Sequence, residues 1–193
     1  MGAGASTTEK KHCALAFKLA KKAVRDGIGE GQPAHGFVII MAHAAAIFAM
    51  KENGKPKLGK IMNPALYDYR DKNLNLNDAD AYATLCLLAC ADGAIVVDLP
   101  TGQILGGNYS IVDLSEAQHD MKGGTRHRSA SSLAQITGGF VIVASEAECK
   151  KLTNAEHVTV FYGNNVPKEE SLQEQARGGA SRLSLFLARV SVS

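Results

Sequence analysis

Three short apolar runs, each bounded by glycine or polar residues, constrain the fold of this 193-residue chain more than any other feature. They are Gly36–Met41, Ala94–Asp98 and Gly139–Ala144. Each run is shorter than an ordinary helix and rich in branched or aromatic side chains, which is typical of a buried β-strand. The sequence therefore predicts a sheet whose strands lie inside the molecule.

Helical patterns alternate with these strands. Apolar residues recur at three- and four-residue spacing over 8–26, 79–90 and 125–137. Asp78 is the predicted cap of the second helix.

Further strands are expected over 103–109, after a turn at Pro100–Gly102, and over 157–162. A strand or a short helix is expected at 44–50. A loop or hairpin tip is expected over 51–63, and a short helix within 64–77. The alternation predicts one globular domain of the α/β (α+β) class.

Composition excludes several classes of protein. The apolar fraction of 46% and the charged fraction of 21% are typical of a soluble globular domain. The net charge of +2 gives no general attraction for nucleic acid, so no nucleic-acid partner is expected. No apolar run approaches the roughly 20 residues that span a bilayer, and no secretory signal is visible. A cytoplasmic location is expected.

The four cysteines, Cys13, Cys86, Cys90 and Cys149, lack the paired spacing of a zinc site. We expect them to be buried, reduced thiols.

The chain starts Met-Gly-Ala-Gly-Ala-Ser, which fits the N-myristoylation pattern at Gly2; a flexible terminus of small residues is the alternative. One myristoyl chain would bind a membrane only weakly. Lysines of the first helix could supply a second signal, although a solvated face is the favoured interpretation of them. They are Lys10, Lys11, Lys18, Lys21 and Lys22.

The stretch Gly123–Ser129 predicts a phosphate site. Two glycines lead into Thr125-Arg126-His127-Arg128-Ser129, where a helix begins. The first turn of a helix has unpaired N–H groups and the positive end of the dipole, both of which favour an anion. Thr125 and Ser129 are four residues apart, so their hydroxyls share one face. Arg126 and Arg128 lie about 200° apart on a regular helix, so they cannot face the same phosphate.

Three segments in succession resemble the diadenylate cyclase domain family. They are Asp92-Gly93-Ala94, Gly124-Thr125-Arg126-His127-Arg128, and Val143-Ala144-Ser145-Glu146. Each is weak alone, but their order is specific, and the firm match covers roughly 79–148. The resemblance implies a twisted mixed sheet flanked by helices. It divides the chain into a flexible N-terminus (1–8), the cyclase domain (9–165) and a helical extension (166–193).

The resemblance implies that two ATP molecules are condensed to cyclic di-3′,5′-adenylate with release of two pyrophosphates. Each 3′-hydroxyl would attack the α-phosphate of the other ATP across a face-to-face homodimer or a larger homo-oligomer. Mg²⁺ or Mn²⁺ would neutralise the triphosphates. A nucleotide-binding module of the same fold that has lost turnover is the alternative.

The resemblance also assigns roles to residues. Asp92 is expected to bind the metal or orient the hydroxyl, and otherwise to make a turn. Thr125 and Arg126 are expected to act on the leaving pyrophosphate, with Gly124 and Ser129 beside them. Arg128 is expected to hold the loop or the opposing subunit, and His127 to contact phosphate, orient a carboxylate or serve structure.

Further residues are assigned at the strand ends. Ser145 is expected near the α-phosphate and Glu146 near the metal. Gly93 would let the backbone approach the nucleotide, since glycine has no Cβ, and Ala94 is expected beside it in the nucleotide site. Tyr109 is expected near the adenine, or is an ordinary strand tyrosine. Two departures, Ala91 where many members have His and Ala147 where many have a second Glu, affect the metal surroundings.

Overall fold

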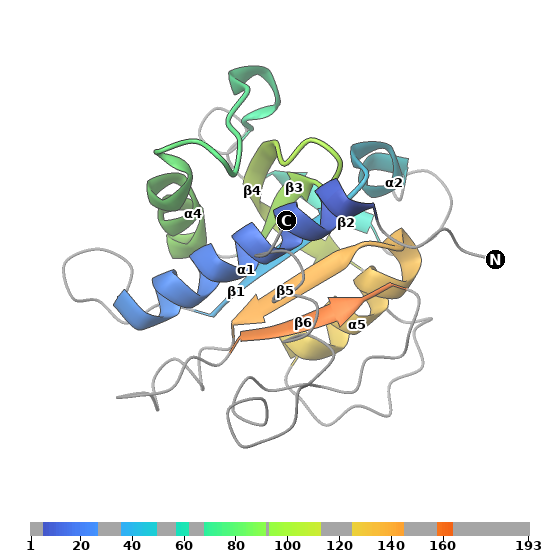
Figure 1. Cartoon of the computed structure of the whole chain (residues 1–193). Helices are drawn as coiled ribbons and strands as arrows, with labels where there is room; N and C mark the ends of the chain where they lie inside the picture. Colours follow the sequence, from blue (N-terminus) through green and yellow to red (C-terminus); the bar gives the residue numbers. More distant parts are fainter. Residues whose placement is uncertain are drawn as a thin grey trace, which may run out of the picture.

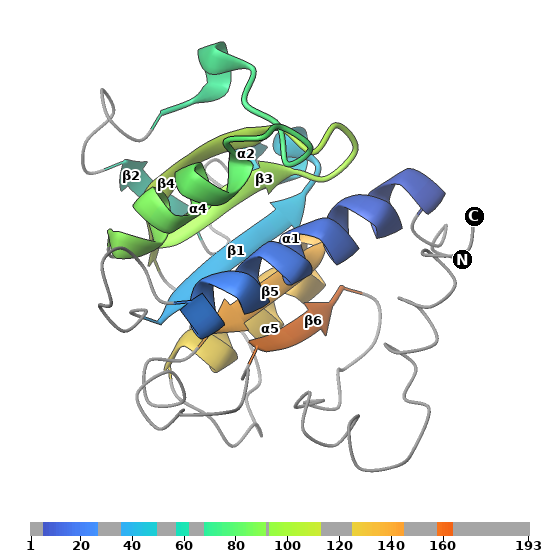
Figure 2. The ribbon, with the colours of Figure 1, turned by 60° about the vertical axis from the view of Figure 1, so that its left-hand side comes forward.

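A six-stranded mixed sheet forms the centre of the computed structural model (Figures 1 and 2), which describes residues 6–26, 36–49, 57–61, 68–91, 93–112, 125–144 and 158–163. The strands are β1 (Phe37–Ala42), β2 (Lys57–Ile61), β3 (Ala94–Asp98), β4 (Ile104–Val112), β5 (Phe140–Ala144) and β6 (Val158–Tyr162). The helices are α1 (Thr7–Asp26), α2 (Ala44–Ala49), η1 (Arg70–Lys72), α4 (Ala81–Cys90) and α5 (Thr125–Thr137). The strand order is β2-β4-β3-β1-β5-β6.

The two faces of the sheet are covered by different helices. All six residues of β1 are buried. Ile39 and Met41 join a core cluster with α1 and α4, whereas Val38 and Ile40 join a second cluster with α5 and Ile47 of α2. This alternation follows from the two-residue period of a strand, which sends successive side chains to opposite faces. The apolar runs are continuous because both faces are buried.

The three apolar runs and the three long helical patterns are confirmed as β1, β3 and β5 and as α1, α4 and α5. The short segment after β1 is a helix, α2, and the turn at Pro100–Gly102 is present, with Gly102 at a φ of +73°.

Two sequence predictions were wrong in detail. The expected loop over 51–63 contains β2, which pairs with β4 at one end of the strand order. Its sequence, Lys-Leu-Gly-Lys-Ile, mixes charge and glycine with apolar residues and therefore resembles a loop. Asp78 does not cap α4, because the helix begins at Ala81. The Asp78 carboxylate instead accepts a hydrogen bond from the Asn75 amide at 2.7 Å.

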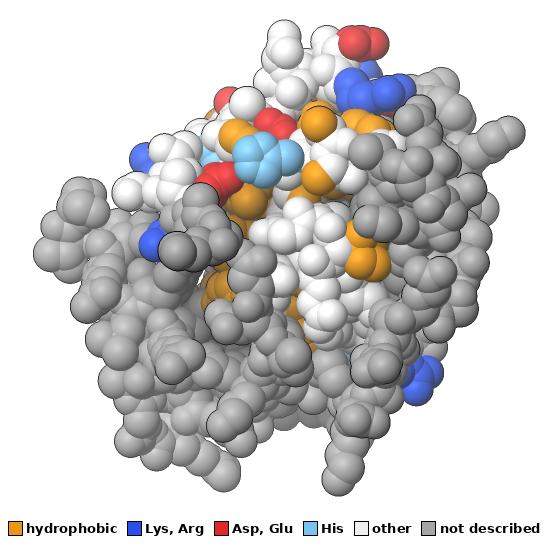
Figure 3. Space-filling view, turned by 90° about the vertical axis from the view of Figure 1, so that its right-hand side faces the viewer, with side chains coloured by type: hydrophobic (Ala, Val, Ile, Leu, Met, Phe, Trp, Pro, Cys, Tyr) orange, Lys and Arg blue, Asp and Glu red, His pale blue; other side chains and the backbone are white. Residues whose placement is uncertain are grey.

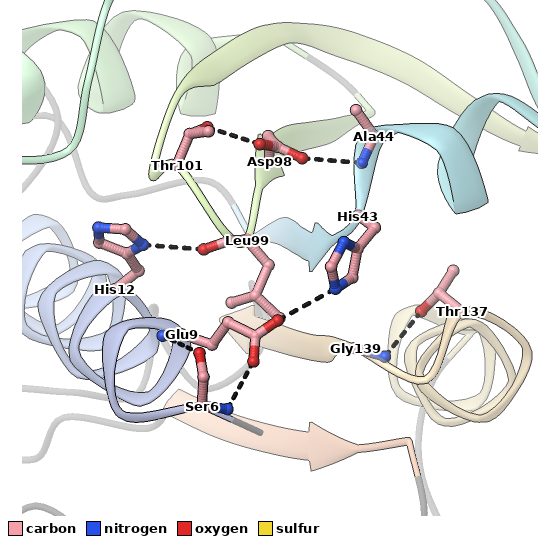
Figure 4. Close-up of polar contacts among 10 residues, drawn as sticks. All are labelled: Ser6, Glu9, His12, His43, Ala44, Asp98, Leu99, Thr101, Thr137 and Gly139. Atoms are coloured by element: carbon pink, nitrogen blue, oxygen red, sulfur yellow. Dashed lines mark hydrogen bonds and ion pairs between the residues drawn. The ribbon is translucent and has the colours of Figure 1, made fainter. Parts of the chain in front are cut away.

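At the end of the sheet where β1 and β3 finish, polar contacts connect separate elements. Figure 3 shows histidine and acidic side chains next to one another on this side of the molecule. Asp98 accepts hydrogen bonds from the Ala44 amide at 2.8 Å and from the Thr101 hydroxyl at 2.5 Å (Figure 4). His43 Nε2 lies 3.1 Å from Glu9 Oε1, which connects the start of α1 to the end of β1. The donors and acceptors in these contacts pair with one another, which gives the contacts a structural role.

The first turn of α1 has a capping box. The Ser6 amide donates to Glu9 Oε2 at 2.6 Å, and the Glu9 amide donates to Ser6 Oγ at 3.2 Å. This reciprocal pair satisfies amides that a helix start leaves without partners. The amide of Ser6 and the nearby His43 lower the pKa of the Glu9 carboxyl.

The cysteine prediction was correct for Cys13 and wrong for Cys90. Cys13 is buried, and this burial raises its pKa to about 12. Cys90, at the last position of α4, is exposed, and Cys86 is half-buried. All three are free thiols, and Cys149 lies outside the described residues. Within the described part of the chain, no helix is long and apolar enough to cross a membrane.

Candidate functional site

The central strand β1 brings the ends of two other strands to one edge of the sheet. On one side Val38 pairs with Ala94, the first residue of β3. On the other side Phe37 pairs with Ala144, the last residue of β5. Because β3 runs parallel to β1 and β5 runs antiparallel, β3 begins where β5 ends. Ala94 and Ala144 are therefore separated by two strand spacings, about 10 Å.

Several predicted site residues adjoin these two strand ends in the chain. Asp92 precedes Ala94 by two positions, and Ser145 and Glu146 directly follow Ala144. These three residues lie outside the described part of the chain, as does Gly124. Their described neighbours are held at one edge of the sheet.

Helix α5 starts at the same edge. Only Gly138 and Gly139 connect its last residue to β5, and Gly138 has a φ of +68°. The Gly139 amide donates to Thr137 Oγ1 at 3.2 Å within this turn. The chain therefore reverses, and α5 runs back along β5 so that its first turn lies where β5 ends (Figure 1). Backbone amides at the start of a helix are suited to bind phosphate.

The side chains of the first turn of α5 point in different directions. Arg126 is half-buried, whereas Arg128 is exposed. Because α5 is a continuous α-helix over this stretch, the two guanidinium groups leave it on different sides. This agrees with the expectation that they do not share one phosphate.

His127 and Ser129 belong to the buried side of α5, with 4% and 7% of their surface exposed. The His127 ring packs edge-on against Phe161 of β6, with ring centroids 6.1 Å apart and planes at 76°. Among the roles left open for His127, this geometry favours a packing role between α5 and the sheet. The side chain of Thr125 lies outside the described atoms, although its backbone begins the helix.

Gly93 is required by the backbone of β4. Its φ is +112°, and a Cβ at this position would lie 2.9 Å from the carbonyl carbon of Asn108 and the carbonyl oxygen of Tyr109. The missing side chain therefore allows β4 to approach the segment before β3. Ala94 pairs with Tyr109, and only 1% of the whole residue is exposed, so its contact with a nucleotide stays a prediction.

Tyr109 lies at the same edge but is buried. Only 1% of its surface is exposed, and it packs in the core cluster on the α5 face. Among the described residues its hydroxyl has no hydrogen-bond partner. Burial first, and then the nearby Asp68 carboxylate, raise the pKa of Tyr109. The neutral hydroxyl is thus a hydrogen-bond donor, and stacking on adenine stays a prediction.

Comparison with known proteins identifies the family. Residues 32–157, well over half of the chain, match the DAC family model, which is described as the nucleotide-binding domain of the DisA bacterial checkpoint controller. The chain belongs to the DAC family. A comparison with curated proteins gives no match.

Two solved structures are similar to this DAC domain. A crystal structure of a double mutant of DacA from Staphylococcus aureus is 16% identical, with a TM-score of 0.48; the alignment covers 89% of this chain and 95% of that one. A hypothetical membrane spanning protein from Bacillus cereus is also 16% identical, with a TM-score of 0.45, and 80% and 61% of the two chains are covered. The family match is what establishes a nucleotide-binding domain of the diadenylate cyclase type.

The DAC domain has a further polar pair that the sequence analysis did not single out. Arg70 of η1 donates from Nε to both carboxylate oxygens of Asp68, at 2.8 and 3.1 Å. The Arg70 guanidinium also lies 5.6 Å from the centre of the Phe48 ring. Besides burial, the Asp68 carboxylate raises the pKa of Tyr109, and the Arg70 guanidinium lowers it. In the sequence, the only indication of this pair is that Asp68 and Arg70 carry opposite charges and are two residues apart.

The metal expected for the DAC domain would depend on Asp92 and Glu146. In the part of the chain that is described, no three His, Cys, Asp or Glu residues gather closely enough to hold a metal ion. In the sequence, Asp92 and Glu146 adjoin the strands on either side of β1, and carboxylate oxygens are ligands that Mg²⁺ and Mn²⁺ prefer. The donor chemistry of these two residues fits such an ion, which stays a prediction.

Proposed function

We propose that the chain is a diadenylate cyclase that joins two ATP molecules into cyclic di-3′,5′-adenylate and releases two pyrophosphates. One observation carries this proposal. The pairing of β1 with β3 and β5 brings the neighbours of Asp92 and of Ser145-Glu146 to the edge at which α5 begins. This supports a nucleoside triphosphate site at that edge, to which segments about 50 residues apart in sequence would contribute.

Each new bond would form between the 3′-oxygen of one ATP and the α-phosphorus of the other, while the bond from that phosphorus to pyrophosphate breaks. We assign Asp92 to orient the attacking hydroxyl or to hold the metal with Glu146. A bound Mg²⁺ or Mn²⁺ would supply positive charge to the triphosphate. Ser145 would contact the α-phosphate.

The start of α5 would stabilise the leaving pyrophosphate. Negative charge develops on this group as the bond breaks, and fixed donors aimed at it lower the barrier. The amides of the first turn, the Thr125 and Ser129 hydroxyls and the Arg126 guanidinium are the proposed donors. Arg128 is exposed on another side of the helix, which suits contact with a second subunit in a face-to-face dimer.

A nucleotide-binding domain without turnover is the second candidate. Ala91, half-buried directly before Asp92, offers no metal ligand where many members of the family have histidine. The loss of one donor would weaken metal binding more than it would weaken contacts between phosphate and the start of α5.

The decisive experiment is incubation of the concentrated protein with ATP and Mn²⁺, followed by chromatography of the nucleotides. We expect cyclic dinucleotide and pyrophosphate. Asp92→Asn should abolish synthesis without unfolding the protein, because it changes charge but hardly changes shape. Asp71→Asn, on an exposed aspartate of η1, is the matched control and should retain activity.

The two candidates give different results. Retained ATP binding without cyclic dinucleotide, measured by calorimetry on the same preparation, would support the module without turnover. Unfolding of Asp92→Asn would instead make Asp92 a structural residue.

A further inference from the structure

The outward side of α1 carries a row of lysines. Lys11, Lys18 and Lys22 are exposed and, at 100° per residue, fall within an arc of about 40°. None of the three forms an ion pair with a described residue. The only acidic residues of this 20-residue helix are Glu9 in its first turn and Asp26 at its end. The row is therefore a uniformly positive strip.

An uncharged apolar surface lies beside this strip. Helix α4 packs next to α1 on the same face of the sheet and contains no charged residue. Lys22 Nζ lies 3.8 Å from the centre of the Tyr82 ring, which connects the two helices. Leu87 is 50% exposed, and Cys90 is exposed one turn further along.

Both features point away from the sheet. Leu85 and Ala89 of α4 are buried, and Leu87, midway between them, lies on the opposite side of the helix. In α1, Phe17 and Ala20 are buried, whereas Lys18 and Lys22 point outward. Helices α1 and α4 lie side by side on one face of the sheet (Figure 2), so their exposed sides, with the lysines and Leu87, form the outer surface of this layer.

We propose that this α1–α4 surface docks on a bilayer of anionic lipids, with the lysines on headgroup phosphates and Leu87 at the edge of the acyl region. Positive charge beside exposed apolar side chains is the composition of peripheral membrane surfaces. A nucleic acid would use the lysines but would gain nothing from an uncharged helix. The N-myristoylation pattern at Gly2 precedes α1 in the sequence and favours the same partner.

Docking in this orientation is compatible with the candidate nucleotide site. Helix α5 covers the opposite face of the sheet from α1 and α4. The first turn of α5 would therefore remain accessible to ATP and to a second copy of the chain.

The test is co-sedimentation of the unmodified full chain with vesicles of phosphatidylcholine, with or without phosphatidylserine. We expect binding at low salt only to vesicles that contain phosphatidylserine, and release as the salt concentration rises. Lys18→Glu should weaken binding on the order of 10-fold, because it replaces attraction by repulsion. Lys72→Glu, the same charge change on exposed Lys72 of η1, should leave binding unchanged.

A second pair of variants tests the apolar part. Leu87→Gln should weaken binding several-fold, whereas Ile136→Gln, on the other large exposed apolar side chain of the described residues, should not. Circular dichroism checks that each variant is folded. Equal loss in Lys18→Glu and Lys72→Glu, or absence of binding to phosphatidylserine at low salt, would overturn the proposal. Preferential binding of a DNA duplex that depends on Lys18 but not on Leu87 would overturn it in favour of nucleic acid.

Discussion

At the scale of single residues, Gly93 has a steric requirement that is independent of any nucleotide. Both its φ of +112° and the 2.9 Å approach of the β4 backbone exclude a side chain. We predict that Gly93→Ala lowers the free energy of unfolding by about 2–4 kcal/mol, because backbone strain and a clash with rigid backbone add together. Urea unfolding measures this loss.

Gly138 provides the matched control. It also has a positive φ, +68°, but a Cβ there would have no heavy atom within 4 Å. Gly138→Ala should therefore cost only the strain of the left-handed conformation, about 1 kcal/mol. If Gly93→Ala and Gly138→Ala lower the free energy of unfolding equally, the contact between residue 93 and β4 does not contribute to the loss.

The buried thiol of Cys13 makes the free energy of unfolding depend on pH in the alkaline range. Burial raises its pKa from 9.0 to about 12, so the folded protein retains a proton that the unfolded chain loses. The stabilisation that results from this difference in pKa is fully present below pH 9 and is lost as pH rises towards 12. The free energy of unfolding should fall by up to about 1.4 kcal/mol per pH unit in this window.

The variant Cys13→Ala isolates this effect. Its unfolding free energy should decline less steeply above pH 9 than that of the wild type, whatever the cost of the cavity. Cys90→Ala, which removes an exposed thiol, should keep the wild-type slope. An unchanged slope in Cys13→Ala would contradict the prediction.

At the scale of elements, the start of α1 depends on its capping box. Ser6 and Glu9 exchange hydrogen bonds across the first turn. We predict that Ser6→Ala lowers the free energy of unfolding by about 1 kcal/mol, since it leaves a helix-start amide without its acceptor. Thr8→Ala, at an exposed position of the same turn, should have little effect. Thermal unfolding of both variants distinguishes them, and equal shifts would argue against the cap.

Helices and buried strands were predictable because local spacing determines them. Leu85, Leu88 and Ala89 recur at helical spacing and are buried, and the run Phe140–Ala144 is a strand. The strand β2 was missed because its residues lack an apolar run, and pairing with β4 makes it a strand. The capping box was visible as Ser-x-x-Glu but was overlooked.

At the scale of the whole molecule, a face-to-face reaction requires two copies of the chain. We predict that specific cyclase activity rises with protein concentration until the dimer is saturated, because in the proposed reaction each domain holds one of the two ATP molecules. A dilution series assayed for cyclic dinucleotide, with sedimentation at the same concentrations, measures this dependence. Specific activity that stays constant through dissociation into monomers would contradict a reaction between two ATP molecules held by two chains.

The sequence by itself determined the secondary structure of the buried elements and the family, because helical periodicity, apolar runs and short motifs are local properties. Only the tertiary structure decided which segments meet. Hydrogen bonding of β1 to both β3 and β5 brought the neighbours of Asp92 and Ser145 to one edge. The tertiary structure also showed why Gly93 is glycine, and that α1 with its lysines packs next to α4 with its exposed Leu87. Contacts between distant segments depend on strand order and register, which no local pattern specifies.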